Sequence, residues 1–138
     1  MGYLIKKVVQ QIVTAKITLT SANLLTPGYI VDIPEYPAIP DYYWQVLSMN
    51  GLLSNGTVGY VGASSVHIQA STAIDLQFRF PASFIGNIGS WGFGTISTNI
   101  PNPKQFVDND NLQIHNPGTL TVGDSDLILY ITAILIRL

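Results

Sequence analysis

The alternation of apolar and polar residues predicts β-strands along most of the chain. Between residues 12 and 20, apolar side chains occupy every second position, at Val13, Ala15, Ile17 and Leu19. A period of two places these side chains on one face of a strand, which we expect to be buried. Strands are likewise expected at Tyr29–Ile33, Tyr42–Met49, Ser65–Ala70, Ile74–Phe80, Leu112–His115 and Leu127–Leu138.

The segments between these strands carry residues typical of turns. Thr20–Leu25 resembles one capped turn of helix, and the three prolines of Pro34–Asp41 predict an extended loop. Asn-Gly pairs tolerate positive φ and favour hairpins, so turns are expected at Asn50-Gly51 and Asn55-Gly56. The glycine-rich segment 84–95 leaves its register open, and Thr98–Asn111 reads as a polar loop.

The last predicted strand is apolar on both of its faces. One face carries Leu127, Leu129, Ile131, Ala133 and Leu135. A strand with one face in water should be polar there. The opposite face nevertheless carries Ile128, Tyr130, Thr132, Ile134, Ile136 and Leu138. We therefore expect one face to pack on the core and the other to contact another subunit.

Residues 1–9 form an apolar arm ahead of the first strand, with Tyr3, Leu4 and Ile5 as its largest apolar group. The arm either extends the sheet or reaches a neighbouring chain. Its apolar stretch is too short for the core of a signal peptide. The longest apolar run, Leu127–Ile136, falls short of the roughly 20 residues that a membrane-spanning helix needs. The sequence thus predicts no membrane partner.

The pattern as a whole predicts an all-β fold, an antiparallel β-sandwich of the jelly-roll type, formed by residues 10–138 as one domain. About eight short strands with mixed loops favour a sandwich. Alternating strand and helix units, which parallel folds require, are missing.

Charged residues make up 10% of the chain, against about 25% in an ordinary soluble domain. With a net charge of −2 and six Lys and Arg residues, the chain lacks the basic stripe that nucleic acid would need. Because interface cores are depleted of Lys, Glu and Asp, the low charge favours a surface that neighbouring subunits cover. A neutral, hydroxyl-rich surface in water is the alternative.

The sequence offers little chemistry. It contains no Cys and a single Glu, Glu35, and it lacks the Gly-x-Ser-x-Gly elbow and the phosphate loop. His67 and His115 have no metal-ligand neighbours in sequence, although the fold could bring them together. Asp108 and Asp110 lie in a stretch without the Gly and Glu of a calcium loop. We expect no enzyme, no cofactor and no metal centre, and leave open a surface cation at the Asp-rich loop.

Aromatic residues suggest an alternative function. Tyr36, Trp44, Trp91 and Phe93 could form a platform for a sugar or another amphipathic ligand. Most aromatic side chains of a β-sandwich belong to its core, which is the competing interpretation.

Two stretches, Ile17–Leu25 and Asn116–Thr132, resemble small virion proteins of tailed bacteriophages. In that group a strand and a Thr-x-Ala-like turn open the domain. A stretch with Asn-Pro-Gly and Gly-Asp-Ser, followed by an apolar strand, closes it. Tyr29–Asp41 lacks the basic residue expected after the first turn.

The resemblance implies a jelly-roll module on a capsid, head fibre or tail, often trimeric and without catalytic residues. The expected function is therefore a structural virion protein that assembles with itself and with other virion proteins. The alternative is a receptor-binding or carbohydrate-binding module that contacts a host-surface glycan.

Overall fold

Strands dominate the part of the chain that the structure describes. This computed structural model describes residues 11–63, 66–71, 76–80, 82–87, 89–95 and 110–137. The strands are β1 (Gln11–Leu19), β2 (Tyr29–Asp32), β3 (Tyr42–Gly56), β4 (Val61–Ala63), β5 (His67–Ala70), β6 (Leu76–Arg79), β7 (Gly89–Thr95), β8 (Leu112–Asn116), β9 (Thr119–Thr121) and β10 (Leu127–Arg137). Two short helices, α1 (Ser21–Leu25) and α2 (Ala82–Ile85), lie between strands.

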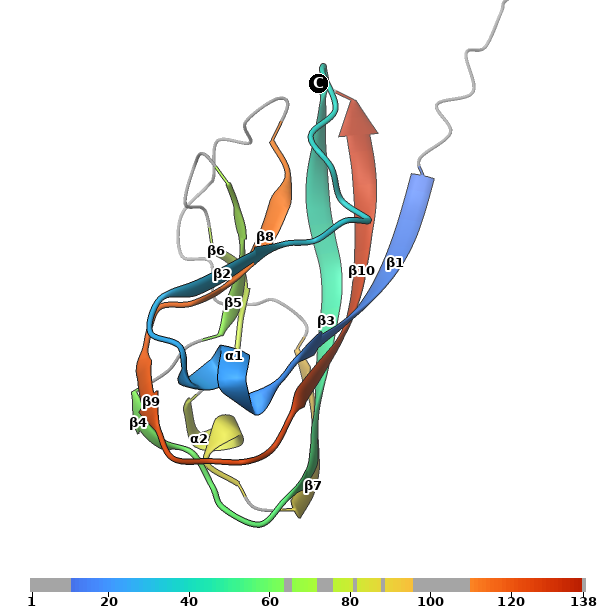
Figure 1. The fold of residues 1–138 in the computed structure, drawn as a ribbon. Helices are drawn as coiled ribbons and strands as arrows, with labels where there is room; N and C mark the ends of the chain where they lie inside the picture. Colours follow the sequence, from blue (N-terminus) through green and yellow to red (C-terminus); the bar gives the residue numbers. More distant parts are fainter. Residues whose placement is uncertain are drawn as a thin grey trace, which may run out of the picture.

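The strands form three antiparallel sheets, which confirms the predicted all-β class. Sheet A has the order β1-β10-β3-β7, and sheet B has the order β2-β8-β5-β6. Figure 1 shows sheet A along one side of the molecule and sheet B along the other, with both helices near the lower end. Strands β4 and β9 form a small third sheet, sheet C.

The pairing between strands is nested along the sequence. Strand β1 pairs with β10, β2 with β8, β3 with β7, and β5 with β6, all antiparallel. The first half of the chain therefore runs beside the second half in reverse order. Two further contacts, β10 with β3 and β8 with β5, join these pairs into the four-stranded sheets.

The first strand and first helix follow the sequence pattern. In β1, Ala15 and Leu19 are buried, Val13 and Ile17 pack on the core, and the alternate positions are exposed. Thr20 caps α1 by accepting a hydrogen bond from the backbone N–H of Asn23, whose side chain reciprocates at the Thr20 backbone. This capping box starts a helix too short to form on its own.

Strand β3 contradicts the predicted turn at Asn50-Gly51, because it continues through that pair to Gly56. Asn50 pairs with Tyr130 of β10 on one side and with Gly94 of β7 on the other. Instead, the absence of a side chain at Gly51 lets the Phe80 ring pack closely against the backbone of β3. A Cβ atom there would lie 2.7 Å from Cζ of Phe80, a ring buried between the sheets.

The predicted hairpin at Asn55-Gly56 is also wrong, because both residues belong to the end of β3. Gly56 lets the Ser125 side chain pack closely against the backbone, since a Cβ atom on residue 56 would overlap Oγ of Ser125. Both glycines thus mark packing rather than reversal of the chain.

A bulge lets the long β3 keep one face buried throughout. The register between β10 and β3 shifts between Thr132 and Ala133. On one side of the shift the buried β3 residues are Trp44 and Val46, and on the other they are Met49 and Leu53. The extra residue changes which positions face inward, and it turns Leu47 outward, where it is 43% exposed.

The core lies between sheets A and B and draws on nearly every element. Sheet A contributes Leu129 and Met49, sheet B contributes Ile68 and Ile114, and α1 contributes Leu24. All five are at most 1% exposed.

At the lower end of the molecule, hydrogen bonds join the turn before β10 to the residues that follow β3. Asp124 Oδ1 accepts hydrogen bonds from the backbone N–H groups of Thr57 and Val58, both at 2.8 Å, and Oδ2 accepts one from the Thr57 hydroxyl at 2.6 Å. The bond from the Thr57 hydroxyl, followed by that from the Val58 N–H, holds the pKa of Asp124 below its ordinary value. The folded state therefore favours the ionised carboxylate.

Asp124→Asn is expected to lower stability at neutral pH, because the amide cannot accept all three bonds as a charged group does. A lowered carboxyl pKa contributes stability that is fully present above the ordinary value of 3.8 and is lost as pH falls through the folded-state pKa. Below pH 3.8 the variant should therefore lose less stability than the wild type does. Urea unfolding at several pH values measures this difference. Asp41→Asn is the control, since Asp41 is exposed at a turn and Asn tolerates its positive φ. Equal acid sensitivity of both variants would contradict the role of Asp124.

Candidate functional site

The outer face of sheet A, the side turned away from the core, is the strongest candidate for a functional surface. Along β10, Leu127, Leu129, Ile131 and Ala133 face the core and are at most 1% exposed. The alternate residues of β10 therefore face outward. They are joined by outward residues of β1 and β3, and in this group Ile12, Tyr130, Leu47 and Leu52 are 61%, 44%, 43% and 38% exposed.

The register places four apolar residues of this face together at one end. Ile12 of β1 lies directly opposite Ile134 of β10, and Ile136 lies opposite Tyr43 of β3. Directly opposed side chains on one face of a sheet are about 5 Å apart at Cβ and contact each other. We call Ile12, Tyr43, Ile134 and Ile136 the isoleucine corner. A second apolar pair, Ile128 and Leu52, lies farther along the same face.

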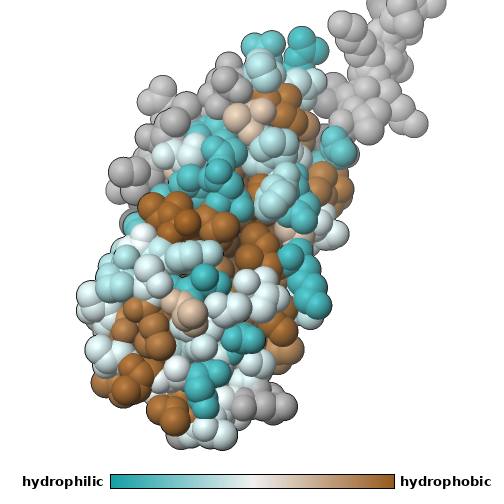
Figure 2. Space-filling model, viewed as in Figure 1, coloured by the Kyte–Doolittle hydropathy of each residue, from teal (hydrophilic) through white to brown (hydrophobic). Residues whose placement is uncertain are grey.

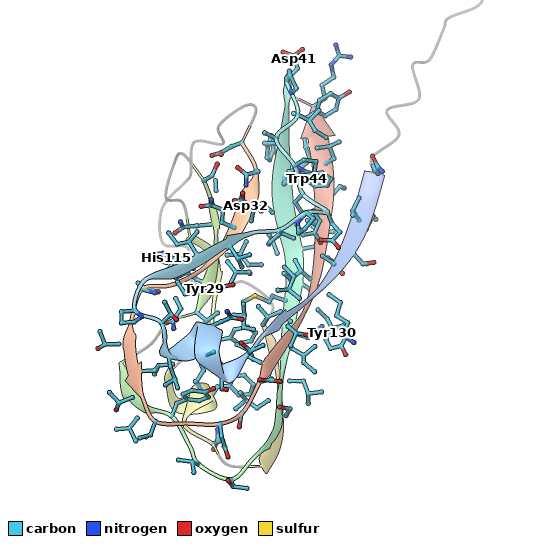
Figure 3. All side chains as sticks on the ribbon, viewed as in Figure 1. Tyr29, Asp32, Asp41, Trp44, His115 and Tyr130 are labelled. Carbon is cyan, nitrogen blue, oxygen red and sulfur yellow. The ribbon has the colours of Figure 1, made fainter. Side chains whose placement is uncertain are left out.

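Neutral polar residues and one cation fill the middle of the face. Thr14 is opposite Thr132, which in turn is opposite Ser48. Lys16, the single charged residue that the described strands place on this face, is opposite Tyr130. Its Nζ lies 5.7 Å from the centroid of the Tyr130 ring, a cation–π contact. Figure 3 shows Tyr130 pointing away from the body of the molecule.

Four predicted interface residues, Ile128, Tyr130, Ile134 and Ile136, are thus brought together on one face. Leu138, Tyr3, Leu4 and Ile5, also predicted for the interface, lie outside the described residues. The sequence reasoning missed Ile12, Leu47 and Leu52. The sequence signal for the last two is that each adjoins another apolar residue, in Val46-Leu47 and Leu52-Leu53, since neighbouring side chains of a strand point to opposite faces.

The predicted ligand platform fails at two of its four residues. Tyr36 is 0% exposed and Trp44 is 4% exposed, and their ring centroids lie 5.1 Å apart inside the core. The Tyr36 hydroxyl lies 3.0 Å from the carbonyl oxygens of both Val13 and Ile131, and Trp44 Nε1 donates to the carbonyl of Pro37 at 2.8 Å.

Buried rings whose polar atoms bond to the backbone present no surface to a ligand. Burial and the nearby Glu35 charge raise the pKa of Tyr36, so the hydroxyl keeps its proton. Trp91 and Phe93 belong to β7, where the backbone of Trp91 pairs with Leu53 and that of Phe93 with Gly51. Their side chains lie outside the described part of the structure.

The described residues hold no cluster of three or more His, Cys, Asp or Glu side chains that could bind a metal ion. Asp110 of the Asp-rich loop is 5% exposed and accepts a hydrogen bond from the Ser71 hydroxyl, while Asp108 lies outside the described residues. Within the same ranges, no helix is long and apolar enough to cross a membrane.

A smaller group of exposed apolar residues lies at the lower end of the molecule. Val58, Val61 and Val122 are 46%, 61% and 56% exposed. Figure 2 shows hydrophobic side chains near sheet C at that end, separated by polar ones. These valines do not join the outer face of sheet A, which makes them useful as controls for it.

Comparisons of this chain with protein-family models, with curated proteins and with solved structures found no match.

Proposed function

We propose that this protein is a structural subunit of a bacteriophage particle, with a jelly-roll fold, and that copies of it assemble through the outer face of sheet A. The observation that carries the proposal is the outer face itself, which is apolar at the isoleucine corner and holds one charged residue among its described positions. Within the corner Ile12 is exposed, while Tyr43, Ile134 and Ile136 are partly buried. Apolar side chains gathered on the outer face of a sheet are typical of protein interaction sites.

The strand order supports the jelly-roll assignment. A jelly roll arises when an antiparallel ribbon of eight strands winds into two four-stranded sheets. Sheets β1-β10-β3-β7 and β2-β8-β5-β6 have the pairing that such winding produces, with β4 and β9 as additions. Jelly rolls are common in viral capsids, and also in lectins and cupins, so the fold supports a virion role without requiring it.

A second copy of the chain is the occupant that the surface chemistry favours. The face is neutral apart from Lys16, so two copies can meet without several like charges being buried together. Around Lys16, its centre consists of hydroxyl and amide side chains, which can donate to and accept from the same residues of a copy. Depletion of charge at the centre of an interface is the usual composition of such contacts.

The resemblance of Ile17–Leu25 and Asn116–Thr132 to phage virion proteins supplies the rest of the proposal. It favours a trimer, further contacts with other virion proteins, and a location on the assembled particle. The alternative of a glycan-binding module is weakened, because Tyr36 and Trp44 are core residues.

Lysine substitutions with a matched control test the proposed face. Ile12 and Val61 are both β-branched strand residues and are both 61% exposed, but Ile12 lies on the outer face of sheet A and Val61 on sheet C. Ile12→Lys should weaken self-association and incorporation into particles, because it buries an unpaired charge at the contact. Val61→Lys should leave both unchanged, and neither should alter the free energy of unfolding of the subunit by more than about 0.5 kcal/mol.

Association is measured by light scattering, and incorporation by the amount of each variant in purified particles. Normal incorporation of the Ile12→Lys protein would contradict the proposed surface. If self-association is weakened while incorporation stays normal, the face joins copies in solution but is not the one that builds the particle.

A further inference from the structure

Sheet B contains a cluster of three polar side chains, His67 and Gln69 of β5 and His115 of β8. All four residues of β5 are buried, and among them His67 and Gln69 are 5% and 4% exposed. His67 is the direct cross-strand partner of His115 on β8, and their ring centroids lie 5.0 Å apart at an interplanar angle of 78°. Figure 3 shows His115 on the opposite side of the molecule from Tyr130, away from the proposed assembly surface.

One amide oxygen serves both imidazole rings. Gln69 Oε1 lies 3.0 Å from Nε2 of His67 and 3.2 Å from Nδ1 of His115. An amide oxygen only accepts hydrogen bonds, and a neutral imidazole has a single N–H. Both bonds therefore form when His67 carries its proton on Nε2 and His115 carries its proton on Nδ1.

We propose that His67, Gln69 and His115 form an acid-sensitive link between β5 and β8, which holds the two strands together while His115 is neutral and loosens when His115 gains a proton. A second proton makes an imidazole a cation. On His115 this cation lies directly opposite the ring of His67 and loses hydration through burial.

Among the described side chains of sheet B, the single carboxylate, Asp32, does not pair with His115. On β8, the residue next to the cluster is Gln113, which pairs with both Gln69 and Asp32. The Asp32 carboxylate of β2 accepts from the side-chain amides of Asn111 and Gln113, at 2.9 and 2.7 Å, and the residue of β2 opposite His115 is Ile30. On β6, the backbone partner of His67 is Arg79, itself a cationic residue, whose side chain lies outside the described part.

The direction of the effect follows from proton linkage. Burial, and then the neighbouring His67, hold the pKa of His115 below its ordinary value of 6.5. The unfolded chain therefore binds more protons than the folded chain, so stability rises with pH and falls as pH drops below 6.5. The chain has two histidines and no Cys, so no other side chain has an ordinary pKa in this window.

Urea unfolding between about pH 8 and pH 5 tests the proposal. The wild-type unfolding constant should rise on acidification, by up to about tenfold per pH unit for each proton taken up. His67→Gln and His115→Asn keep an amide N–H near the donor nitrogen of each ring, and each should reduce the rise. Gln69→Glu should reverse or abolish it, because a carboxylate between the rings favours their cationic forms.

The proposal is overturned if the unfolding constant of the wild type is the same at all pH values. It is also overturned if the double variant His67→Gln/His115→Asn shows the same rise as the wild type. Should a variant fail to fold, nitrogen NMR of the wild-type imidazoles gives an independent answer. We expect the Nε2–H tautomer for His67 and the Nδ1–H tautomer for His115, with His115 changing to the imidazolium form as unfolding becomes easier. The Nε2–H tautomer at His115 would show that the Gln69 oxygen is not the shared acceptor, and would also overturn the proposal.

Discussion

Gly123→Ala is expected to destabilise the protein by about 3 kcal/mol or more, because backbone strain and a steric clash occur together. Gly123 has φ of +110°, a conformation that side chains rarely adopt. A Cβ atom there would overlap Cδ1 of Tyr60. The Tyr60 ring has little freedom to move away, since it is 6% exposed and its hydroxyl donates to the carbonyl of Ser125 at 2.5 Å.

The electrostatic surroundings also hold Tyr60 in place. Burial, with the charges of Asp126 and Asp124, raises the pKa of Tyr60 to about 12, so the hydroxyl remains a donor across the physiological range. Moving the ring to accommodate the added methyl group would break this bond and leave the buried hydroxyl without its partner.

Gly28→Ala is the matched control for Gly123→Ala. Gly28 has φ of +66°, and nothing lies within 4 Å of the Cβ position. Only the left-handed backbone should cost stability there, roughly 1–2 kcal/mol. Urea unfolding of the two variants separates strain from clash. Equal losses would show that the contact with Tyr60 contributes nothing.

Trp44→Ala is expected to cost about 3–5 kcal/mol, the range for removing a large aromatic side chain from a core. That is a large fraction of the stability of a typical domain, about 5–15 kcal/mol. The reason is the burial of Trp44 against Tyr36, together with the lost bond from Nε1 to the carbonyl of Pro37. Thermal or urea unfolding measures the effect.

Tyr130→Ala is the control for a surface aromatic residue. Tyr130 is 44% exposed on the outer face of sheet A, so its loss should change subunit stability far less, within about 1 kcal/mol. If Trp44→Ala left the free energy of unfolding near the wild-type value, Trp44 would not be a core residue, and the ligand platform would regain its support.

Strand alternation predicted the parts of the fold that depend on local sequence. The buried face of β1, the cap of α1 and the inward residues of β10 all follow from side chains near one another in the chain. The all-β class follows from the same patterns, and so does the outward group of Ile128, Tyr130, Ile134 and Ile136.

The sequence could not separate two uses of glycine. Asn50-Gly51 has the composition of a hairpin turn, but Gly51 lies in a strand because Phe80, 29 positions away in sequence, packs against its backbone. Contacts of this kind depend on the folded arrangement and leave no local pattern. The same holds for the His67 and His115 pair, whose register is set by β5 and β8 rather than by their spacing.

We propose that copies of this chain assemble through the outer face of sheet A. Mass in solution, measured by light scattering on the purified protein over a concentration series, tests it most directly. A closed oligomer such as a trimer, reduced to smaller species by Ile12→Lys but not by Val61→Lys, is the predicted result. A protein that stays monomeric at every concentration would show that this face does not join copies of the chain.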